Sequence, residues 1–142
     1  MKFDHIGVAA ATLEHGRAVL RDTLEIRDWT VEFADPLNHI HCQFGRDASG
    51  VCYELVAPLD ARSPIGKAVR TRTNTLHHVA YLVADLTAEA GRLIASGCIA
   101  ITQPNPAVAY NGAPIQFFFT ALGSIVELIE APSHAHVYRR EA

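Results

Sequence analysis

Two short segments of the chain alternate apolar and polar positions and carry a histidine at matching places. Residues 76–83 read LHHVAYLV, and residues 3–8 read FDHIGV. Alternation with a period of two is typical of a β-strand that has one buried face. Each segment is followed by a helix N-cap residue, Thr12 or Asp85, and then by apolar residues at helical spacing. The pattern therefore predicts a strand followed by a helix at two places.

The two segments belong to a repeat with a constant spacing of 73 residues. This spacing separates His5 from His78 and Glu54 from Glu127, and it also relates Gln43 to Gln116, Leu13 to Leu86 and Leu20 to Leu93. A repeat of this length without a net insertion indicates one structural module written twice.

The remaining segments predict the same order of elements in each copy. The first copy contains a strand over 2–9, a helix over 13–23, and strands over 29–33, 40–45 and 51–57. The second contains a strand over 76–83, a helix over 86–96, and strands over 99–102, 115–120 and 124–129. The predicted fold is α+β, two tandem βαβββ modules over about 1–58 and 76–132, with a connector over 59–75 and a loosely held tail over 133–142.

Turn and capping residues predict the structure of two further segments, a short helix and a long loop. Ser63-Pro64 has the pattern of an N-cap followed by proline, so a short helix is expected over 64–70. Residues 103–114 are rich in Pro, Asn and Gly and form a long loop, which indicates a lid or the edge of a pocket, with an inert connector as the alternative.

Composition narrows the class of protein. A chain of 142 residues can bury the core of a single domain. A formal net charge of −3 gives no basic footprint, so a nucleic-acid partner is not expected. No apolar run approaches the ~20 residues of a membrane span. The three cysteines, Cys42, Cys52 and Cys98, lack CxxC spacing and indicate free thiols in a reducing compartment, so a cytoplasmic location is expected.

Four residues at the repeat spacing carry the candidate chemistry. His5 and His78 lie within the first strand of each copy, and Glu54 and Glu127 lie within the last. A charged residue between aliphatic neighbours is costly unless it is paired or bound to a metal. Two imidazoles and two carboxylates that converge in the hollow of a curled sheet would suit a divalent metal with open water positions. A histidine–glutamate ion pair in the core is the alternative interpretation.

Other polar residues are assigned with less support from the pattern. His39 and His41 share a face of the third expected strand with Gln43, where they either line the pocket or lie exposed. His39, Gln43, Tyr110 and Gln116 are the candidate substrate contacts, with Tyr110 at the tip of the 103–114 loop. His77 is expected on the opposite face from His78, in a structural role. The basic residues of the connector, Arg62, Lys67, Arg70 and Arg72, are expected to form a solvated surface, with an anion-binding rim as the alternative.

At these residues the chain resembles the vicinal-oxygen-chelate superfamily over nearly its whole length. The resemblance implies that the two modules form a curled, U-shaped mixed sheet around one divalent metal ion, with His5, Glu54, His78 and Glu127 as ligands. The ligand set is similar to that of bacterial glyoxalase I, a lactoylglutathione lyase. The surrounding segments 3–8, 57–59, 76–81 and 126–128 look more like methylmalonyl-CoA epimerase.

The chain departs from both branches at identifiable positions. Epimerases usually have glutamine where Glu54 stands, and residues 121–123 read ALG where glyoxalase I usually has an aspartate-proline-aspartate-glycine turn. Ring-cleaving dioxygenases of the superfamily have no ligand at the position of Glu54. A carboxylate there favours the four-ligand, redox-neutral branch.

The resemblance implies a metal-dependent isomerase, epimerase or lyase that acts through an enolate on a small carbonyl or thioester substrate. The expected cofactor is one zinc, nickel or cobalt ion. Glu127 or Glu54 is the expected catalytic base, with His41 in reserve. A homodimer is expected. The alternative is a metal-free drug-binding protein of the bleomycin-resistance type, although such proteins lack the four ligands.

Overall fold

The computed structural model describes residues 1–132, so the tail over 133–142 lies outside the described residues. The first half contains β1 (Lys2–Ala9), α1 (Leu13–Leu24), β2 (Asp28–Trp29), β3 (Phe33–Asp35), β4 (Ile40–Arg46), β5 (Cys52–Pro58) and α2 (Gly66–Thr71). The second contains β6 (Leu76–Leu82), α3 (Leu86–Ala95), β7 (Ile99–Ala100), β8 (Asn105–Ala107), a 3₁₀ turn η1 (Val108–Tyr110), β9 (Ala113–Phe119) and β10 (Ile125–Ile129).

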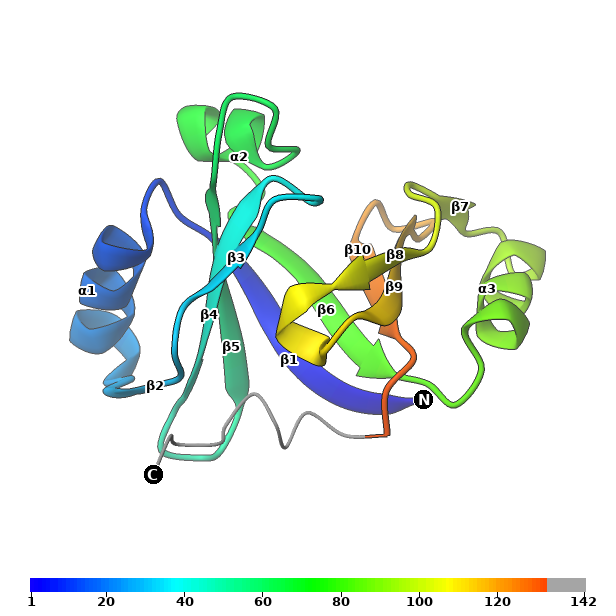
Figure 1. The fold of residues 1–142 in the computed structure, drawn as a ribbon, viewed down its shortest axis with the longest axis horizontal. Helices are drawn as coiled ribbons and strands as arrows, with labels where there is room; N and C mark the ends of the chain where they lie inside the picture. The colour runs from blue at the N-terminus through cyan, green and yellow to red at the C-terminus, as the bar shows by residue number, and fades with distance from the viewer. Residues whose placement is uncertain (133–142) are drawn as a thin grey trace.

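The ten strands within residues 1–132 belong to one mixed, open sheet with the order β2-β4-β5-β1-β6-β10-β9-β7, to which β3 adds beside β4 and β8 beside β9. At its centre β1 and β6 run antiparallel, and each pairs in parallel with the last strand of its own module, β5 or β10. Figure 1 shows the sheet curling, with α1 outside one half and α3 outside the other. The predicted α+β architecture of two joined modules is confirmed.

The two long helices begin where the sequence predicts. The Thr12 hydroxyl accepts a hydrogen bond from the backbone N–H of His15 at 3.1 Å, and the Asp85 carboxylate accepts one from the N–H of Ala88 at 2.9 Å. Each cap satisfies a backbone donor that has no partner inside the helix. Leu20 and Leu93, at equivalent positions, are buried against the outer side of the sheet.

Three expected elements differ from the structure. The strand over 29–33 is instead divided, because β2 pairs with the Gly45–Arg46 end of β4 and β3 pairs with its beginning. The connector helix begins at Gly66 with no side-chain cap, so the predicted capping role of Ser63 is wrong. The loop over 103–114 contains β8 and η1 and ends in a turn whose Asn111 adopts a positive φ of 55°. Within residues 1–132, no helix is long and apolar enough to span a membrane.

Candidate metal centre

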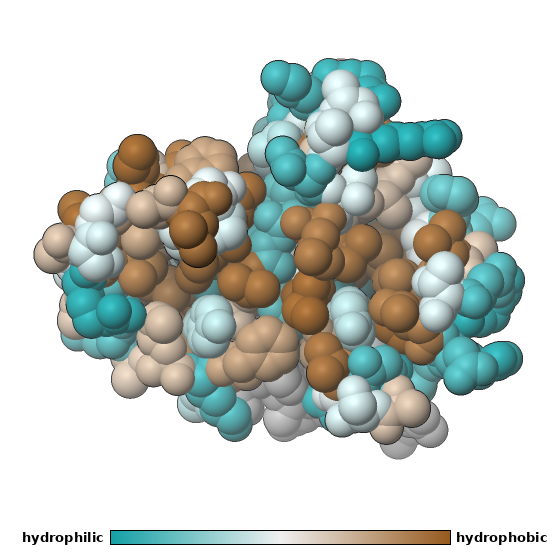
Figure 2. Space-filling model, turned by 180° about the vertical axis from the view of Figure 1, so that it is seen from behind, coloured by the Kyte–Doolittle hydropathy of each residue, from teal (hydrophilic) through white to brown (hydrophobic). Residues whose placement is uncertain are grey.

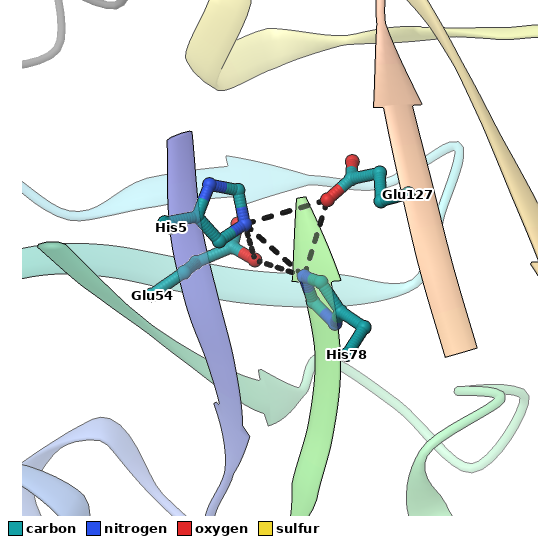
Figure 3. Close-up of side chains that lie close together, drawn as sticks. All are labelled: His5, Glu54, His78 and Glu127. Carbon is teal, nitrogen blue, oxygen red and sulfur yellow. Dashed lines mark hydrogen bonds and ion pairs between the residues drawn. The ribbon is translucent and has the colours of Figure 1, made fainter. Parts of the chain in front are cut away.

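The four central strands of the sheet bring one ionisable side chain each to a common point. Glu54 lies on β5, His5 on β1, His78 on β6 and Glu127 on β10, and these strands are consecutive neighbours in the sheet. Figure 3 shows the four side chains pointing toward one another from their strands. All four are buried, with His5 fully so. The predicted convergence of the two histidines and two glutamates is therefore present in the structure.

The distances within this cluster are short and similar. The Nε2 atoms of His5 and His78 lie 3.1 Å apart. Glu54 Oε2 lies 3.2 Å from each of these nitrogens, and Glu127 Oε2 lies 3.4 Å from His5 Nε2 and 3.1 Å from His78 Nε2. Each residue thus offers one nitrogen or oxygen atom, and all four atoms lie within 4.8 Å of one another.

This geometry fits a divalent metal ion. Ligands that each lie about 2.1 Å from one ion are separated from one another by roughly 3–3.4 Å, and the five separations that involve a histidine nitrogen, 3.1–3.4 Å, fall in this range. Glu127 Oε2 is buried without a hydrogen bond of acceptable geometry among the described residues. Buried polar atoms are normally satisfied, so an oxygen left in this way indicates a missing partner. The donor set of two nitrogens and two carboxylates suits zinc, nickel or cobalt.

The charges of the cluster stabilise one another in the absence of a metal. Burial acts to lower the pKa of His5, but the Glu54 charge and the close contacts with the Asp4, Glu127 and Glu54 carboxylates outweigh it and hold this pKa well above its usual value. Burial likewise opposes the charged form of His78, and the close contacts with the two glutamate carboxylates raise its pKa. For Glu54, burial is outweighed by the charges and hydrogen bonds of both histidines, so its pKa lies well below the usual value.

Asp4 is a buried partner of the cluster that the sequence pattern missed. Phe3 pairs with Tyr81 and His5 with Ala80, so β1 carries one extra residue between these pairs. A bulge of this kind interrupts the alternation of faces, and Asp4 is buried next to His5. Its carboxylate lies 2.8 Å from His5 Nδ1. A carboxylate at Nδ1 fixes the proton there and leaves Nε2 free to bind a metal.

His77 is the equivalent residue in the second module, and its expected position on the outer face is wrong. Gly7 pairs with His78 and Val8 with Leu76, so here β6 carries the extra residue. His77 Nδ1 lies 2.8 Å from His78 Nδ1, and the His77 side chain lines the cavity described below. Burial and the His78 charge lower the pKa of His77 to about 4. A neutral His77 can accept the Nδ1 proton of His78, which again leaves His78 Nε2 facing the cluster.

Gly7 makes the close approach of His78 possible. A Cβ atom at position 7 would lie 2.1 Å from His78 Cε1 and 2.3 Å from its Nδ1. The His78 ring therefore occupies the space that any side chain at position 7 would need, which explains the glycine two residues after His5.

Tyr110 lies in the interior and not at an exposed loop tip. The η1 turn and the β8 strand fold the side chain inward, where its hydroxyl donates to the Asp4 carboxylate and lies 3.1 Å from His5 Nδ1. Burial and the nearby Asp4 charge raise the pKa of this hydroxyl far above its usual value. Tyr110 also lines the cavity beside the cluster, so its assignment as a substrate contact stays a prediction.

A cavity of about 260 Å³ opens beside the cluster, and Glu54, His78 and Glu127 lie in its wall. The rest of the wall is mainly apolar and comes from both modules, with Ile40, Val56, Ile65, Ile101, Ile115, Phe117, Phe119 and Ile125 as its larger side chains. A shallower depression of about 410 Å³ at Lys2, Leu82 and Glu130 contains none of the four cluster residues. The smaller cavity is therefore the candidate substrate site.

The structure does not bring the expected polar residues of β4 to this cavity. Ile40 and Cys42 line it, so His41 and Gln43 lie on the opposite face of the strand. His39 precedes the strand, has a positive φ of 56° and is not part of the wall either. His39 Nδ1 instead lies 3.1 Å from Asp60 Oδ2. Consequently His41 is not placed to act as a base, and His39 and Gln43 are not placed as substrate contacts.

Gln43 and Gln116 share a structural role that explains their repeat. The Gln43 side-chain amide donates to the Thr30 carbonyl at 2.6 Å, and that of Gln116 donates to the Thr102 carbonyl at 2.9 Å. In each module this bond holds the irregular segment after the helix against the sheet. Gln116 is thus also turned away from the cavity, whose wall on β9 is formed by Ile115, Phe117 and Phe119.

Comparisons with known proteins agree with this geometry. The model of the Glyoxalase/Bleomycin resistance/Dioxygenase superfamily matches residues 4–119. An uncharacterised protein of Bacillus subtilis, YqjC, is 26% identical over 137 residues, which cover 95% of this chain and 96% of that protein.

Solved structures show the same fold. A methylmalonyl-CoA epimerase from Mycobacterium tuberculosis superposes with a TM-score of 0.76 at 27% identity, covering 95% of this chain and 91% of the other. A hypothetical protein from Bacillus halodurans superposes with a TM-score of 0.76 at 24% identity, covering 99% of this chain and 96% of the other.

Proposed function

The chain belongs to the Glyoxalase/Bleomycin resistance/Dioxygenase superfamily, and from this premise we propose that it is a divalent-metal-dependent isomerase, epimerase or lyase. Its substrate would be a small carbonyl or thioester compound that loses a proton next to the carbonyl group. The observation that carries the proposal is the buried cluster of His5, Glu54, His78 and Glu127 at the wall of an apolar cavity. The similarity in fold to a methylmalonyl-CoA epimerase supports the same class of reaction.

The four cluster residues would hold the metal, and the residues behind them would orient the histidines. A bound divalent ion would act as a Lewis acid that polarises the substrate carbonyl and stabilises the negative charge developing on its oxygen. Asp4 and His77 contact the Nδ1 atoms of His5 and His78, which keeps both Nε2 atoms directed at the ion site. The apolar wall excludes water from the reacting carbon.

Glu127 is the stronger candidate for the base that moves the proton. Both glutamates line the cavity, and both direct Oε2 at the cluster. Glu127 Oε2 is buried and lacks a satisfied hydrogen bond among the described residues. Glu127 is therefore less constrained and better able to approach a substrate proton.

Metal analysis and two activity assays test the proposal. Protein supplied with nickel, cobalt or zinc and then freed of excess ion should retain about one equivalent of metal per chain. The His78→Ala variant should retain far less, because the ion loses a buried ligand. Turnover should then be measured with the methylglyoxal–glutathione hemithioacetal and with methylmalonyl-CoA. Unchanged metal content in His78→Ala would contradict the site assignment.

Absence of metal under all three supplements would favour the alternative, a metal-free small-molecule binder. The intact cluster argues against that alternative, because two buried glutamates serve no purpose in an apolar drug site.

A further inference from the structure

The cavity wall divides into a polar end and an apolar remainder. Glu54, His78 and Glu127 mark the polar end, with His77 beside them. Beyond them the wall is built chiefly from branched aliphatic and phenylalanine side chains of both modules. Figure 2 shows that apolar residues also gather on both sides of a hollow on one face of the molecule. A ligand that enters with its oxygens at the polar end leaves the rest of its body against an apolar surface.

The charges around the cavity disfavour a second anionic group on the ligand. Among residues 1–132, no lysine or arginine lines the cavity, whereas Asp35, Glu54 and Glu127 do. A carboxylate on the distal part of a ligand would lose its hydration and find no cation to pair with. Repulsion from the wall carboxylates would add to this cost.

Asp35 does not present an open site for a cationic group either. Its Oδ2 accepts a hydrogen bond from the Asn38 side-chain amide at 2.9 Å, and its Oδ1 accepts one from the Asn38 backbone N–H at 3.2 Å. The backbone N–H of Val108 also approaches Oδ2 at 3.4 Å. These bonds join the β3–β4 turn to η1, so this carboxylate is already used in closing one rim of the cavity.

We infer that the part of the substrate that lies inside this cavity, beyond its metal-directed oxygens, is a short, uncharged apolar chain or ring. The inference rests on the proposed function, whose substrate class it narrows. A cavity of about 260 Å³ lies below the range of roughly 300–1,000 Å³ that holds drug-sized ligands. The apolar group is therefore small, comparable to a branched aliphatic or single-ring side chain.

Probes of matched shape and different charge test this inference. Isocaprohydroxamate and succinohydroxamate share a chelating head and a two-carbon spacer, and they end in an isopropyl group or a carboxylate of similar shape. With metal-loaded protein, isocaprohydroxamate should bind on the order of 100-fold tighter than acetohydroxamate by calorimetry, because four more buried carbons add to affinity. Succinohydroxamate should bind no tighter than acetohydroxamate. The hydroxamate of β-alanine, which carries an ammonium group, should show no gain either.

The same comparison with amides separates this inference from the proposed function. Isocaproamide and succinamate do not need a metal, so their binding to metal-free protein can be followed by NMR shifts of cavity residues. If the protein takes up none of the three metals, the proposed function is contradicted, and a preference for isocaproamide would still support the inference. Equal or tighter binding of succinohydroxamate or succinamate would overturn the inference, and so would tighter binding of the β-alanine probe.

A charged residue at the cavity wall provides a matched control. Ile101 lines the cavity and is 41% exposed, so Ile101→Lys can add a cation there without disturbing the core. This variant should shift the ratio of the two hydroxamate affinities toward succinohydroxamate by about three- to fivefold, the effect of a partly exposed ion pair. Ile99→Lys places the same charge two residues away at a side chain that is 69% exposed and outside the cavity wall. It should leave the ratio unchanged, and an equal shift in both variants would overturn the inference.

Discussion

Asp4 and His77 occupy the same position in the two modules, and each places a side-chain atom 2.8 Å from Nδ1 of the histidine that follows it. Both residues are the extra member of a bulge in the β1–β6 pairing. The bulges turn two consecutive side chains inward, so that one can reach the ion site and the other can support it. The support is anionic in the first module and neutral in the second.

Replacement of Asp4 by asparagine should weaken metal binding, although all four residues of the cluster remain in place. Loss of the carboxylate behind His5 removes the charge that fixes the proton at Nδ1, an effect typically worth about 10–100-fold in metal affinity. Competition with a chromophoric chelator measures the change. Asp22→Asn, at an exposed ion pair on α1, serves as the control. Equal affinity of Asp4→Asn and wild type would show that Asp4 only fills space.

Gly7→Ala should remove metal binding through displacement of His78. The added methyl group would overlap the ring at 2.1–2.5 Å, so the imidazole must leave its position. Metal content should fall as far as in His78→Ala. The control is Gly91→Ala within α3, where a Cβ meets nothing within 4 Å and the helix should gain about 0.5–1 kcal/mol. Retention of metal in Gly7→Ala would mean that the ring can bind from another position.

Glu54→Gln should retain metal with reduced affinity. The amide oxygen can still coordinate, but the site loses one of its two carboxylate charges. Inductively coupled plasma analysis after dialysis against graded chelator concentrations gives the difference from wild type. Loss of folding in this variant, seen by circular dichroism, would assign Glu54 to the core in place of the metal centre.

Metal-free protein should lose stability as pH rises above the range in which free histidine titrates. The raised pKa values of His5 and His78 mean that the native state binds more protons than the unfolded state in this window. Their stabilisation is complete below pH ~6.5 and is lost as pH passes through the native values, by at most about 1.4 kcal/mol per pH unit for each proton. His77, with a pKa of about 4, is neutral in both states there and adds no slope.

Urea denaturation in the presence of a chelator, at several pH values above 6.5, measures this trend. Metal affinity should change in the opposite direction, because metal binding displaces the same protons. Stability that rises with pH in the metal-free protein would show that the histidines are neutral there. The lowered pKa of Glu54 acts at the acidic end, where its stabilisation is lost as pH falls.

Tyr110→Phe should reduce the free energy of unfolding by about 1–2 kcal/mol, because the buried Asp4 carboxylate loses a hydroxyl donor. Tyr110→Ala should cost about 3–5 kcal/mol, since it also leaves a cavity. Urea denaturation compares both with Tyr81→Phe, a change at a half-buried ring on β6. Equal stability of Tyr110→Phe and wild type would mean that the hydroxyl contributes nothing to folding.

The repeat and the four candidate ligands could be predicted because they depend on features that a sequence carries directly. Spacing relates His5 to His78, and a charge between aliphatic residues marks Glu54 and Glu127. The roles of Asp4 and His77 could not be predicted, because alternation assigns them to the outer face and a bulge is set by how two distant strands pair. The inward position of Tyr110 could not be predicted either, because it depends on how β8 and η1 within residues 103–114 fold.

On β4, the alternation of side chains alone could not predict which residues line the cavity. His41 and Gln43 share a face, as alternation requires, but alternation does not say which face. His39 lies before the strand, where alternation does not apply. The deciding fact is the register in which Phe44 pairs with Glu54, which places Phe44 on the side of the cluster and Gln43 on the other. This register is a property of the folded sheet and has no signature in either strand.

The antiparallel pairing of β1 with β6 joins equivalent strands, so an approximate two-fold axis passes between His5 and His78. Two identical half-length chains could form the same four ligands, but their two sides would be indistinguishable. In this chain the cavity wall includes His78 and His77 behind it, whereas His5 and Asp4 are buried on the other side of the axis and do not line the cavity. We therefore expect the substrate to bind in a single orientation. This departure from two-fold symmetry would allow the protein to distinguish the two ends of its substrate.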